Sequence, residues 1–260
     1  MPDLITLTTD FGTDDPFAGI MKGVIRSIHP TVEIIDLTHG IEPQNVLQAA
    51  LVLKAATPYF PKKTVHVAVV DPGVGGTRRA MAVKNGSCHY VGPDNGIFSG
   101  VLNAKSRCVE LTQKKYFLPE VSATFHGRDI FAPVAAALAK GTLLKSLGPP
   151  IKDPQTLALP EPSWNGKAIE GEVIYIDRFG NAATNIPREL VSVHCPNARK
   201  LTVKIGRTAI RGLAAHYSEG APHMTRSIIN SWNALELFER EGNAARTLKL
   251  KVGQNIQVIP

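Results

Sequence analysis

Residues 65–79 read VHVAVVDPGVGGTRR, an apolar run that stops at Asp71 and is followed by a glycine-rich turn and two arginines. A short β-branched run that ends in Asp, Pro and Gly is typical of a buried strand. Asp71 then comes directly after the carboxyl end of that strand. The stretch admits three interpretations: a phosphate-binding loop, a plain turn, or a carboxylate with an arginine within reach.

A phosphate-binding loop is the poorest of these interpretations. Residues 71–79 lack the G-x-x-x-x-G-K-[ST] spacing, and the carboxylate of Asp71 would repel the anion that such a loop holds. Gly73, Gly75 and Gly76 are instead expected to allow a tight reversal of the chain and a close approach of backbone to a ligand.

The first 145 residues or so alternate strand patterns with helix patterns. Apolar residues at i, i+3 and i+4 predict amphipathic helices over 17–29 and 45–60. Alternating strands and helices predict a parallel sheet covered on both faces. A third helix is expected over 127–141, with Pro133 in its first turn and Gly141 as its C-cap. The strand patterns are LITLTT (4–9), VEIID (32–36), VHVAVV (65–70) and HYVG (89–92).

The composition changes at Gly148. Residues 148–166 hold five prolines and no periodicity, which predicts an extended linker. Beyond it the patterns are strand-like, with a hairpin turn expected at Gly206-Arg207. We therefore expect an α/β domain over 1–148, a Pro-rich linker over 149–166 and an antiparallel β-barrel domain over 167–260. The expected C-terminal strands are 170–177, 200–206, 208–213, 226–230 and 248–259.

Composition and charge favour an ordinary soluble protein of the cytoplasm. Hydrophobic residues make up 43% and charged residues 20% of the chain. No apolar run is long enough for a membrane span, and the N-terminus lacks the basic start of a signal peptide. The three cysteines, Cys88, Cys108 and Cys195, are odd in number and far apart, which fits a reducing compartment. The net charge of +7 is spread along the chain without a basic run, which disfavours nucleic-acid binding.

Polar residues follow each predicted strand of the first domain, and they define one rim of the sheet. Asp10, Asp71 and Asp94 each follow a strand, and Thr38-His39-Gly40 follows another. Ligands of open parallel sheets bind at the carboxyl ends of the strands, where the strand order reverses. A ribose fits this rim best, because a carboxylate accepts hydrogen bonds from two vicinal hydroxyls. Asp10, Asp14 and Asp15 do not follow the calcium-loop spacing, although a metal site remains an alternative.

Five motifs, taken in order, resemble the S-adenosylmethionine (SAM) hydroxide adenosyltransferases, a family also called SAM hydrolases and related to the fluorinase and chlorinase. The resemblance extends from about Leu4 to Val258. It implies an N-terminal α/β domain, a C-terminal β-barrel, and a homotrimer with ligands between the N-terminal domain of one subunit and the C-terminal domain of the next. It implies no metal or redox cofactor. The motifs are TTDFGTDDPF (8–17), VVDPGVGGTRR (69–79), VGPDNG (91–96), FHGRDIFAP (125–133) and IDRFGNAATN (176–185).

The resemblance also implies roles for individual residues. It assigns Asp71, Arg78 and His126 as the catalytic trio and Asp10 as the ribose ligand. Further substrate contacts fall on the C-terminal part of the chain, where they surround adenine and methionine. These implied contacts are Asp177, Phe179, Asn181, Tyr217, Ser231, Asn243 and Ala244.

Two positions depart from the fluorinase pattern. Gln44 stands where the fluorinase has a Trp, and Trp232 stands where it has an Arg. The fluorinase also has Tyr at the positions of Asp71 and His126. A carboxylate would repel a halide but can orient water and accept its proton, so these two residues favour water as the nucleophile.

The expected reaction is attack of water on C5′ of SAM, which gives adenosine and L-methionine. Asp71 and His126 are expected to orient the water, and the sequence leaves open which of them takes the proton. Arg78 would pair with Asp71 and stabilise developing hydroxide. Two alternatives stay open: a non-catalytic adenosine- or SAM-binding protein, and a metal-dependent hydrolase that uses Asp10, Asp14, Asp71 and His126.

Overall fold

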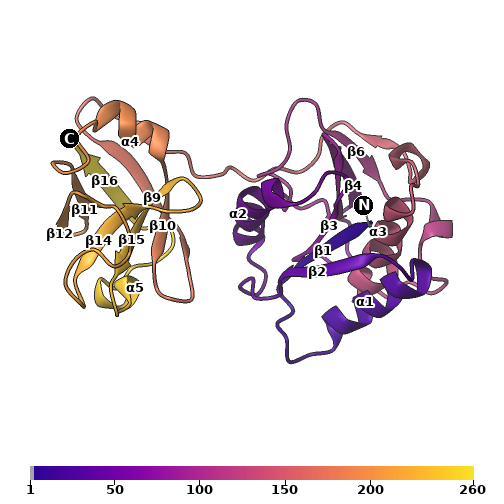
Figure 1. The fold of residues 1–260 in the computed structure, drawn as a ribbon. Coiled ribbons are helices and arrows are strands. Elements are labelled where there is room, and N and C mark those ends of the chain that lie inside the picture. The colour runs from indigo at the N-terminus through magenta and orange to yellow at the C-terminus, as the bar shows by residue number, and fades with distance from the viewer. Residues whose placement is uncertain (1–2) are drawn as a thin grey trace. The chain divides into compact units, whose positions relative to one another are not determined.

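The computed structural model describes residues 3–260. The chain divides into two compact units, with the division between Leu159 and Pro160 (Figure 1). The N-terminal unit is a mixed α/β sheet with helices, and the C-terminal unit is a nearly closed, barrel-like β sheet. This is the fold class predicted from the sequence.

The N-terminal unit is built on a seven-stranded sheet in the order β2-β1-β3-β5-β4-β6-β7. The first four strands in this order are parallel, and the remaining three add antiparallel to one edge. The sheet is therefore parallel only in its first half. The strands are β1 (Leu4–Thr9), β2 (Glu33–Thr38), β3 (Val65–Val69), β4 (Ala80–Asn85), β5 (Cys88–Pro93), β6 (Arg107–Glu110) and β7 (Pro150–Ile151).

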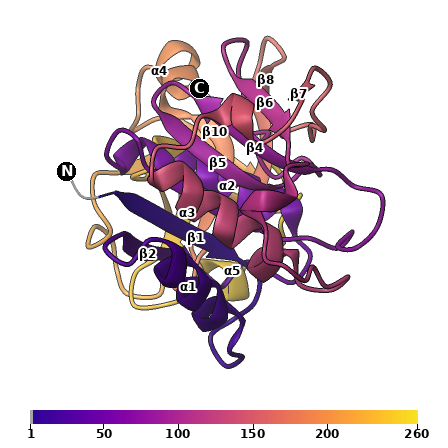
Figure 2. The ribbon, with the colours of Figure 1, turned by 90° about the vertical axis from the view of Figure 1, so that its right-hand side faces the viewer.

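Helices cover both faces of this sheet, as expected. The helices α1 (Phe17–Ile28) and α3 (Ala132–Ala139) pack together against one face, and α2 (Val46–Ala56) packs against the other (Figure 2). Pro133 lies in the first turn of α3, but the helical chain already begins at Gly127, so the missing N–H leaves the Asp129 carbonyl without a helical partner. That carbonyl accepts a hydrogen bond from the backbone N–H of Leu118 instead. Gly141 follows the helix with a φ of +95° and donates its N–H to Leu138. The expected cap at Gly141 is confirmed, and the expected place of Pro133 holds for the α-helical part of the segment, Ala132–Ala139.

Short helical turns complete the N-terminal unit. The segment Gly127–Phe131 is a π-helix that leads directly into α3. Three single turns of 3₁₀ helix are Thr57–Tyr59, Lys114–Tyr116 and Leu144–Ser146. The first of these follows α2 directly. The helix expected over 45–60 is therefore α-helical only to Ala56, and a 3₁₀ turn forms its last part before Phe60.

The Pro-rich segment is held at both of its ends. Pro150–Ile151 forms β7 against β6, and the side chain of Asp153 pairs with Arg79. The backbone N–H of Gln155 donates to Asp94. Further along, β8 (Ser163–Trp164) pairs with β9 of the C-terminal unit.

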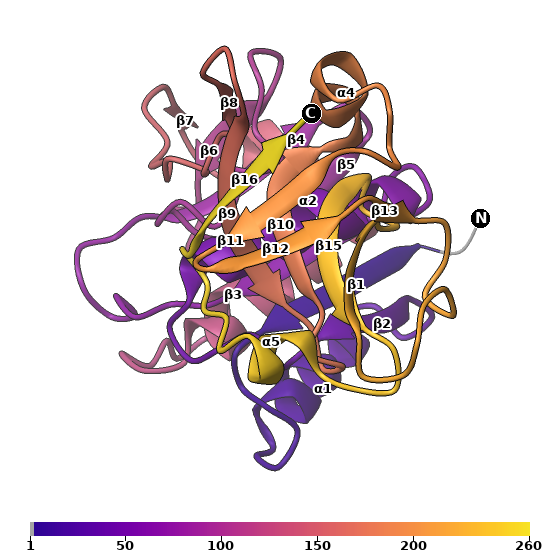
Figure 3. The same cartoon turned by 90° about the vertical axis from the view of Figure 1, so that its left-hand side faces the viewer.

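The C-terminal unit is a nine-stranded sheet whose long path runs β12-β11-β16-β9-β10-β15-β14-β13 (Figure 3). Every pairing is antiparallel except that of β13 with β14, and β12 lies against β14 so that the sheet nearly closes. The predicted hairpin at Gly206-Arg207 is confirmed, because Ile205 pairs with Thr208. The remaining elements are β9 (Ile169–Ile176), β10 (Ala182–Pro187), α4 (Arg188–His194), β11 (Thr202–Ile205), β12 (Thr208–Arg211), β13 (Leu213–Ala214), β14 (Thr225–Ile229), β15 (Ala234–Glu239), α5 (Ala244–Thr247) and β16 (Asn255–Ile259).

The strand predicted over 248–259 is wrong in its first half. Only residues 255–259 form a strand, and the preceding residues form a loop in which Lys249 and Gly253 have positive φ. Leu250 in this loop is buried in the barrel core. Alternating Leu and Lys therefore reflects an anchored loop here and not a strand.

Candidate active site

The sheet places the ends of β1 and β3 at the same level. These two strands are neighbours, β2 lies on the other side of β1, and Thr9 is directly opposite Val69. The strand order therefore reverses between β1 and β3, which is where open α/β sheets bind ligands. A cavity of about 350 Å³ opens here, lined by Asp10, Gln44, Asp71, Phe125 and His126 among others. This confirms the expectation that Asp10 and Asp71 share one rim.

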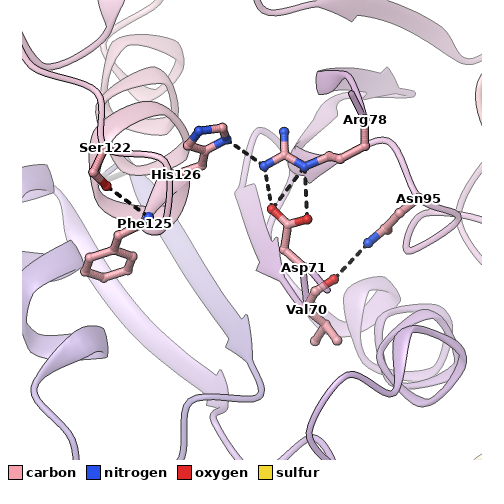
Figure 4. A network of polar contacts seen from close by, with 7 residues as sticks. All are labelled: Val70, Asp71, Arg78, Asn95, Ser122, Phe125 and His126. Carbon is pink, nitrogen blue, oxygen red and sulfur yellow. Dashed lines mark hydrogen bonds and ion pairs between the residues drawn. The ribbon is translucent and has the colours of Figure 1, made fainter. Parts of the chain in front are cut away.

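Asp71, Arg78 and His126 form one hydrogen-bonded group (Figure 4). The Nε of Arg78 donates to Oδ1 of Asp71 at 2.9 Å, and its Nη2 donates to Oδ2 of the same carboxylate. The same Nη2 lies 2.7 Å from Nδ1 of His126. The loop after β3 and the start of the π-helix thus bring together three side chains that are up to 55 residues apart.

The geometry fixes the protonation state of His126. A guanidinium only donates hydrogen bonds, so Nδ1 of His126 accepts, and a neutral ring then carries its proton on Nε2. Partial burial, and next the positive charge of Arg78, lower the pKa of His126 below its ordinary value of 6.5. The neutral ring is therefore the form present near neutral pH.

The Arg78 guanidinium is held from a third direction. Its central carbon lies 5.4 Å from the centre of the Phe131 ring, which is fully buried in the π-helix. The side chains of Arg78 and Asp71 are only 11% and 5% exposed. A paired charge with so little access to water keeps a strong and directed interaction.

The glycines after Asp71 serve the chain's own packing. Gly75 has a φ of +74°, and a Cβ at this position would lie 2.1 Å from the carbonyl oxygen of Ala123. A Cβ on Gly73 would lie 3.3 Å from Cγ of Arg78. The close approach that Gly75 allows is therefore to the backbone of Ala123, three residues before His126, and it holds the two loops together.

Asp129 and Ser122 are positioning residues that the sequence reasoning missed. Asp129 is fully buried, pairs with Arg128, and accepts a hydrogen bond from the backbone N–H of Ser122 at 2.8 Å. The Ser122 hydroxyl in turn accepts the backbone N–H of Phe125 at 3.0 Å (Figure 4). The acid in FHGRD, three residues after His126, was the available signal.

The residues that follow the other strands support the rim, but not all of them line the cavity. Oδ2 of Asp10 accepts the backbone N–H of Gln44 at 2.8 Å, and Gln44 has a φ of +66°. The Nδ2 of Asn95 donates to the carbonyl of Val70 and so secures the residue before Asp71 (Figure 4). Asp94 lies outside the cavity lining, and its buried carboxylate pairs with Arg79.

The metal alternative finds little support in this geometry. Asp14 is exposed and does not line the cavity that holds Asp10, Asp71 and His126. Within residues 3–260, no three His, Cys, Asp or Glu side chains are grouped as metal ligands.

In the C-terminal unit, one group of the expected substrate residues builds the turn between β9 and β10. Oδ1 of Asp177 accepts the backbone N–H groups of Phe179 and Asn181, and its Oδ2 accepts the Asn181 amide. Asn243 caps α5 by accepting the N–H of Arg246, and its side chain packs on Gly180, where a Cβ would lie 2.1 Å from it. The Phe179 ring projects from this turn and is 76% exposed.

A second group is organised by a buried carboxylate. Glu236 is 5% exposed, and its two oxygens accept the Tyr217 hydroxyl and the Asn230 amide, both at 2.8 Å. Oδ1 of Asn230 accepts the backbone N–H of Trp232, which fixes the turn that contains Ser231. Glu236 and Asn230 were not predicted from the sequence. Burial raises the pKa of Glu236, since the carboxylate has lost its contact with water.

An open α/β sheet with an acid, an arginine and a histidine beside a cavity at its strand-order reversal is typical of enzymes that act on small molecules. The chain belongs to the SAM hydroxide adenosyltransferase family. The family's N-terminal domain matches residues 5–148, and its C-terminal domain matches residues 171–257.

Individual relatives agree with this assignment. The (R)-S-adenosyl-L-methionine hydrolase of Salinispora tropica is 38% identical over 259 residues, which cover 98% of this chain and 97% of that protein. A fluorinase of an Actinoplanes species is more distant, with 28% identity over 71% of this chain and 72% of that protein. The crystal structure of an uncharacterized conserved protein from Thermotoga maritima superposes with a TM-score of 0.92 at 34% identity, and covers 98% of this chain and 100% of that one.

Two further expectations concern the whole chain. All three cysteines are free thiols. Over residues 3–260, no helix combines the length and the apolar character that a membrane crossing requires.

Proposed function

We propose that this protein hydrolyses S-adenosyl-L-methionine to adenosine and L-methionine. The observation that carries the proposal is the group formed by Asp71, Arg78 and His126 beside a cavity that also contains Asp10. Membership of the SAM hydroxide adenosyltransferase family, and hydrolases among the relatives, support SAM as the substrate.

The chemistry needs an aligned nucleophile more than an acid. The sulfonium makes methionine a neutral leaving group, so no proton has to be delivered to sulfur. Water attacks C5′, a C5′–O bond forms, and the electron pair of the broken C5′–S bond stays on sulfur. The water proton passes to a base of the protein and then to solvent.

We assign that base to Asp71. Nδ1 of His126 already accepts from Arg78, and its Nε2 carries a proton, so the neutral ring offers no free acceptor. The Asp71 carboxylate accepts hydrogen bonds only, and it keeps lone pairs beyond those used by Arg78. His126 then holds Arg78 in place and offers Nε2–H to orient the water. A general base of this kind contributes roughly 10²- to 10⁴-fold in rate.

The same electrostatics favour water over a halide ion. A halide bound beside Asp71 would meet a carboxylate that repels it. Water instead gains an acceptor for its proton. Arg78 stabilises the negative charge that develops on the oxygen as the proton leaves.

Recognition of the substrate draws on both units in this proposal. Asp10 accepts from the ribose hydroxyls, and Gln44, held by Asp10, lies at the cavity wall. The remaining contacts, to adenine and to methionine, are assigned to residues of the C-terminal unit. They are Asp177, Phe179, Asn181, Tyr217, Ser231, Asn243 and Ala244.

The proposal includes a cytoplasmic homotrimer in which each substrate is bound by the N-terminal unit of one copy and the C-terminal unit of another. Exposed aromatic rings on the C-terminal unit, Phe179 and Tyr217 among them, are consistent with a surface that is covered in the assembly. Light scattering tests the mass. Co-expression of Asp71→Asn with Tyr217→Ala tests the sharing, because mixed trimers then regain intact sites.

The decisive experiment incubates the purified protein with SAM in ¹⁸O-labelled water. We expect equimolar adenosine and methionine, with the label in the 5′-hydroxyl of adenosine. SAM that binds but stays intact would establish the non-catalytic alternative. Activity that disappears with EDTA and returns with a divalent metal would establish the metal-dependent one.

A further inference from the structure

A second and larger cavity lies at the other end of the N-terminal sheet. It has a volume of about 1160 Å³ and is bounded by the strand ends of β4, β5 and β6 and by the chain that follows α3. His89 is directly opposite Val65, the first residue of β3, whereas the candidate active site lies beyond the last residue of β3. The two cavities are therefore at opposite ends of one sheet.

Five cationic side chains from four separate segments line this cavity. They are Lys63, Lys84, Arg107, Lys140 and Lys145, and the lining includes a single carboxylate, Asp3, which pairs with His29. In the described part of the chain none of the five forms an ion pair. The five cations and the one carboxylate give the lining a formal charge of +4, whereas the net charge of the whole chain is +7.

Three of the lining residues form a row across adjacent strands. Lys84 on β4 is directly opposite His89 on β5 and directly opposite Arg107 on β6. Like charges directly opposite each other on neighbouring strands destabilise a sheet. Lys84 and Arg107 therefore repel each other, and a bound anion would remove this repulsion.

The rest of the lining suits a compact anion better than a nucleic-acid strand. Hydroxyls of Ser87, Ser106 and Thr142 add neutral donors at the edge. His89 is the only aromatic ring in the lining, so there is no platform on which successive bases could stack. An open cavity of limited size with five exposed cationic residues matches a multiply charged group of limited length.

We propose that this cavity binds a polyphosphate group. The phosphates would lie along Lys84 and Arg107, with Lys63, Lys140 and Lys145 closing around them. Arginine and lysine are the residues that bind phosphate oxygens through charge-assisted hydrogen bonds. The group could be presented by inorganic polyphosphate or by a nucleotide, and the experiment below separates these sources. The proposal does not depend on SAM hydrolysis.

Calorimetric titration of the full-length protein with inorganic tripolyphosphate is the test. We expect one saturable site per chain, with a Kd that rises steeply with KCl because the contacts are ionic. The variant Lys84→Gln/Arg107→Gln should weaken binding by at least about tenfold. The matched control Lys54→Gln/Lys62→Gln removes two charges that line a separate cavity of the same unit, and it should change the Kd by less than about twofold.

Thermal denaturation provides a second readout that guards against misfolding. Tripolyphosphate should raise the melting temperature of the wild type and of the control, but not that of Lys84→Gln/Arg107→Gln. Without ligand, the latter variant should melt no lower than the wild type, because it relieves the repulsion between the paired cations. ATP and adenosine are titrated separately. If the wild type binds ATP more tightly than tripolyphosphate, and the Lys84→Gln/Arg107→Gln variant binds ATP more weakly, the bound group belongs to a nucleotide. Equal affinities for ATP and tripolyphosphate assign the group to inorganic polyphosphate.

Three outcomes would overturn the proposal. The first is no heat of binding with tripolyphosphate at millimolar concentration. The second is equal weakening in the control and the Lys84→Gln/Arg107→Gln variants. The third is binding of a nucleic-acid oligomer at this site without binding of tripolyphosphate.

Discussion

Asp71 and His126 share one donor, the Nη2 atom of Arg78, which lies within hydrogen-bond distance of Oδ2 of the acid and 2.7 Å from Nδ1 of the imidazole. Sharing a donor makes the two groups unequal. The imidazole has used its only acceptor, whereas the carboxylate has lone pairs to spare. Each prediction about the reaction follows from this inequality.

Replacing Asp71 with Asn should remove the base and leave the shape of the site intact. We expect the turnover number for SAM hydrolysis to fall by at least about 10²-fold, with little change in SAM affinity. Chromatography of adenosine and calorimetry of SAM binding measure the two effects. Asp153→Asn is the matched control, since Asp153 also pairs with an arginine but its side chain is 80% exposed. Unchanged turnover in Asp71→Asn would remove this acid from the mechanism.

The rate should depend on the protonation of His126. Burial and then Arg78 lower its pKa below 6.5, so the neutral ring persists into mildly acidic solution. Once protonated, the ring cannot accept from Arg78 and repels it. Turnover should therefore fall on acidification with a midpoint below pH 6.5. His126→Gln keeps an acceptor for Arg78 but does not titrate, so it should lose this midpoint. The same midpoint in His126→Gln would mean that another group titrates.

Replacing Gly75 with Ala should disturb both loops of the site. The new methyl would meet the Ala123 carbonyl, and its residue would hold a positive φ, which together cost about 3 kcal/mol or more in unfolding free energy. Gly86→Ala is the matched control because Gly86 has a φ of +57° and open space around it. It should cost only about 1 kcal/mol. Urea unfolding measures both; equal losses would show that packing against Ala123 is not important.

Glu236→Gln should act on substrate binding through Tyr217 and Asn230. A glutamine has one acceptor oxygen where the carboxylate has two, so it cannot accept from both the Tyr217 hydroxyl and the Asn230 amide. The contact to Tyr217 must then be remade with the hydroxyl oxygen as the acceptor, at about 1 kcal/mol. If these residues position the adenine and methionine contacts, KM for SAM should rise by about tenfold while kcat changes little. Tyr217→Phe removes only one of the bonds and should have a smaller effect. A fall in kcat alone would contradict a positioning role.

The stability of the N-terminal unit should depend on His66. This ring is fully buried, is stacked on Tyr90 and accepts or donates at Thr6, and burial lowers its pKa to about 4. The unfolded chain binds a proton near pH 6.5 and the native chain only near pH 4. The contribution of His66 to the free energy of unfolding is therefore fully present above pH 6.5, and it declines as the pH falls from 6.5 towards 4.

At pH 5 this linkage amounts to about 2 kcal/mol relative to pH 7. Urea unfolding at the two pH values measures it. His66→Phe should lose less stability on acidification than the wild type does, by that amount, although its absolute stability is lower because Thr6 loses a partner. Equal pH dependence in the two proteins would contradict the assignment to His66.

Much of the fold is visible in the sequence where a periodic pattern and a breaker coincide. The run at 4–9 ends at Asp10, and the helix after it begins beyond Pro16, so both were predicted. The hairpin of β4 and β5 was missed although Gly86-Ser87, a two-residue turn signal, joins the two strands. β10 was missed because AATNIP contains few β-branched residues; its burial comes from neighbouring strands.

The grouping of Asp71, Arg78 and His126 was predictable from the sequence, but the contacts that surround it were not. A carboxylate and an arginine seven residues apart across three glycines indicate a pair, and the resemblance adds the histidine. No pattern indicates that Gly75 touches Ala123, or that Glu236 joins Tyr217 to Asn230, because these contacts depend on chain segments distant in sequence. The cavity lined by five cations was not predicted either, because these cations come from segments that are each only weakly basic and meet only in the folded chain.

In the proposed function, the division after Leu159 separates two tasks, the activation of water and the recognition of adenine and methionine. The acid, the arginine and the histidine, with every contact that aligns them, are encoded before the division. The residues assigned to adenine and methionine lie after it. Substitutions in the second half can therefore alter which sulfonium compound is accepted while the water-activating group stays intact. A lineage built on this plan can change its choice of substrate and its choice of nucleophile in separate steps.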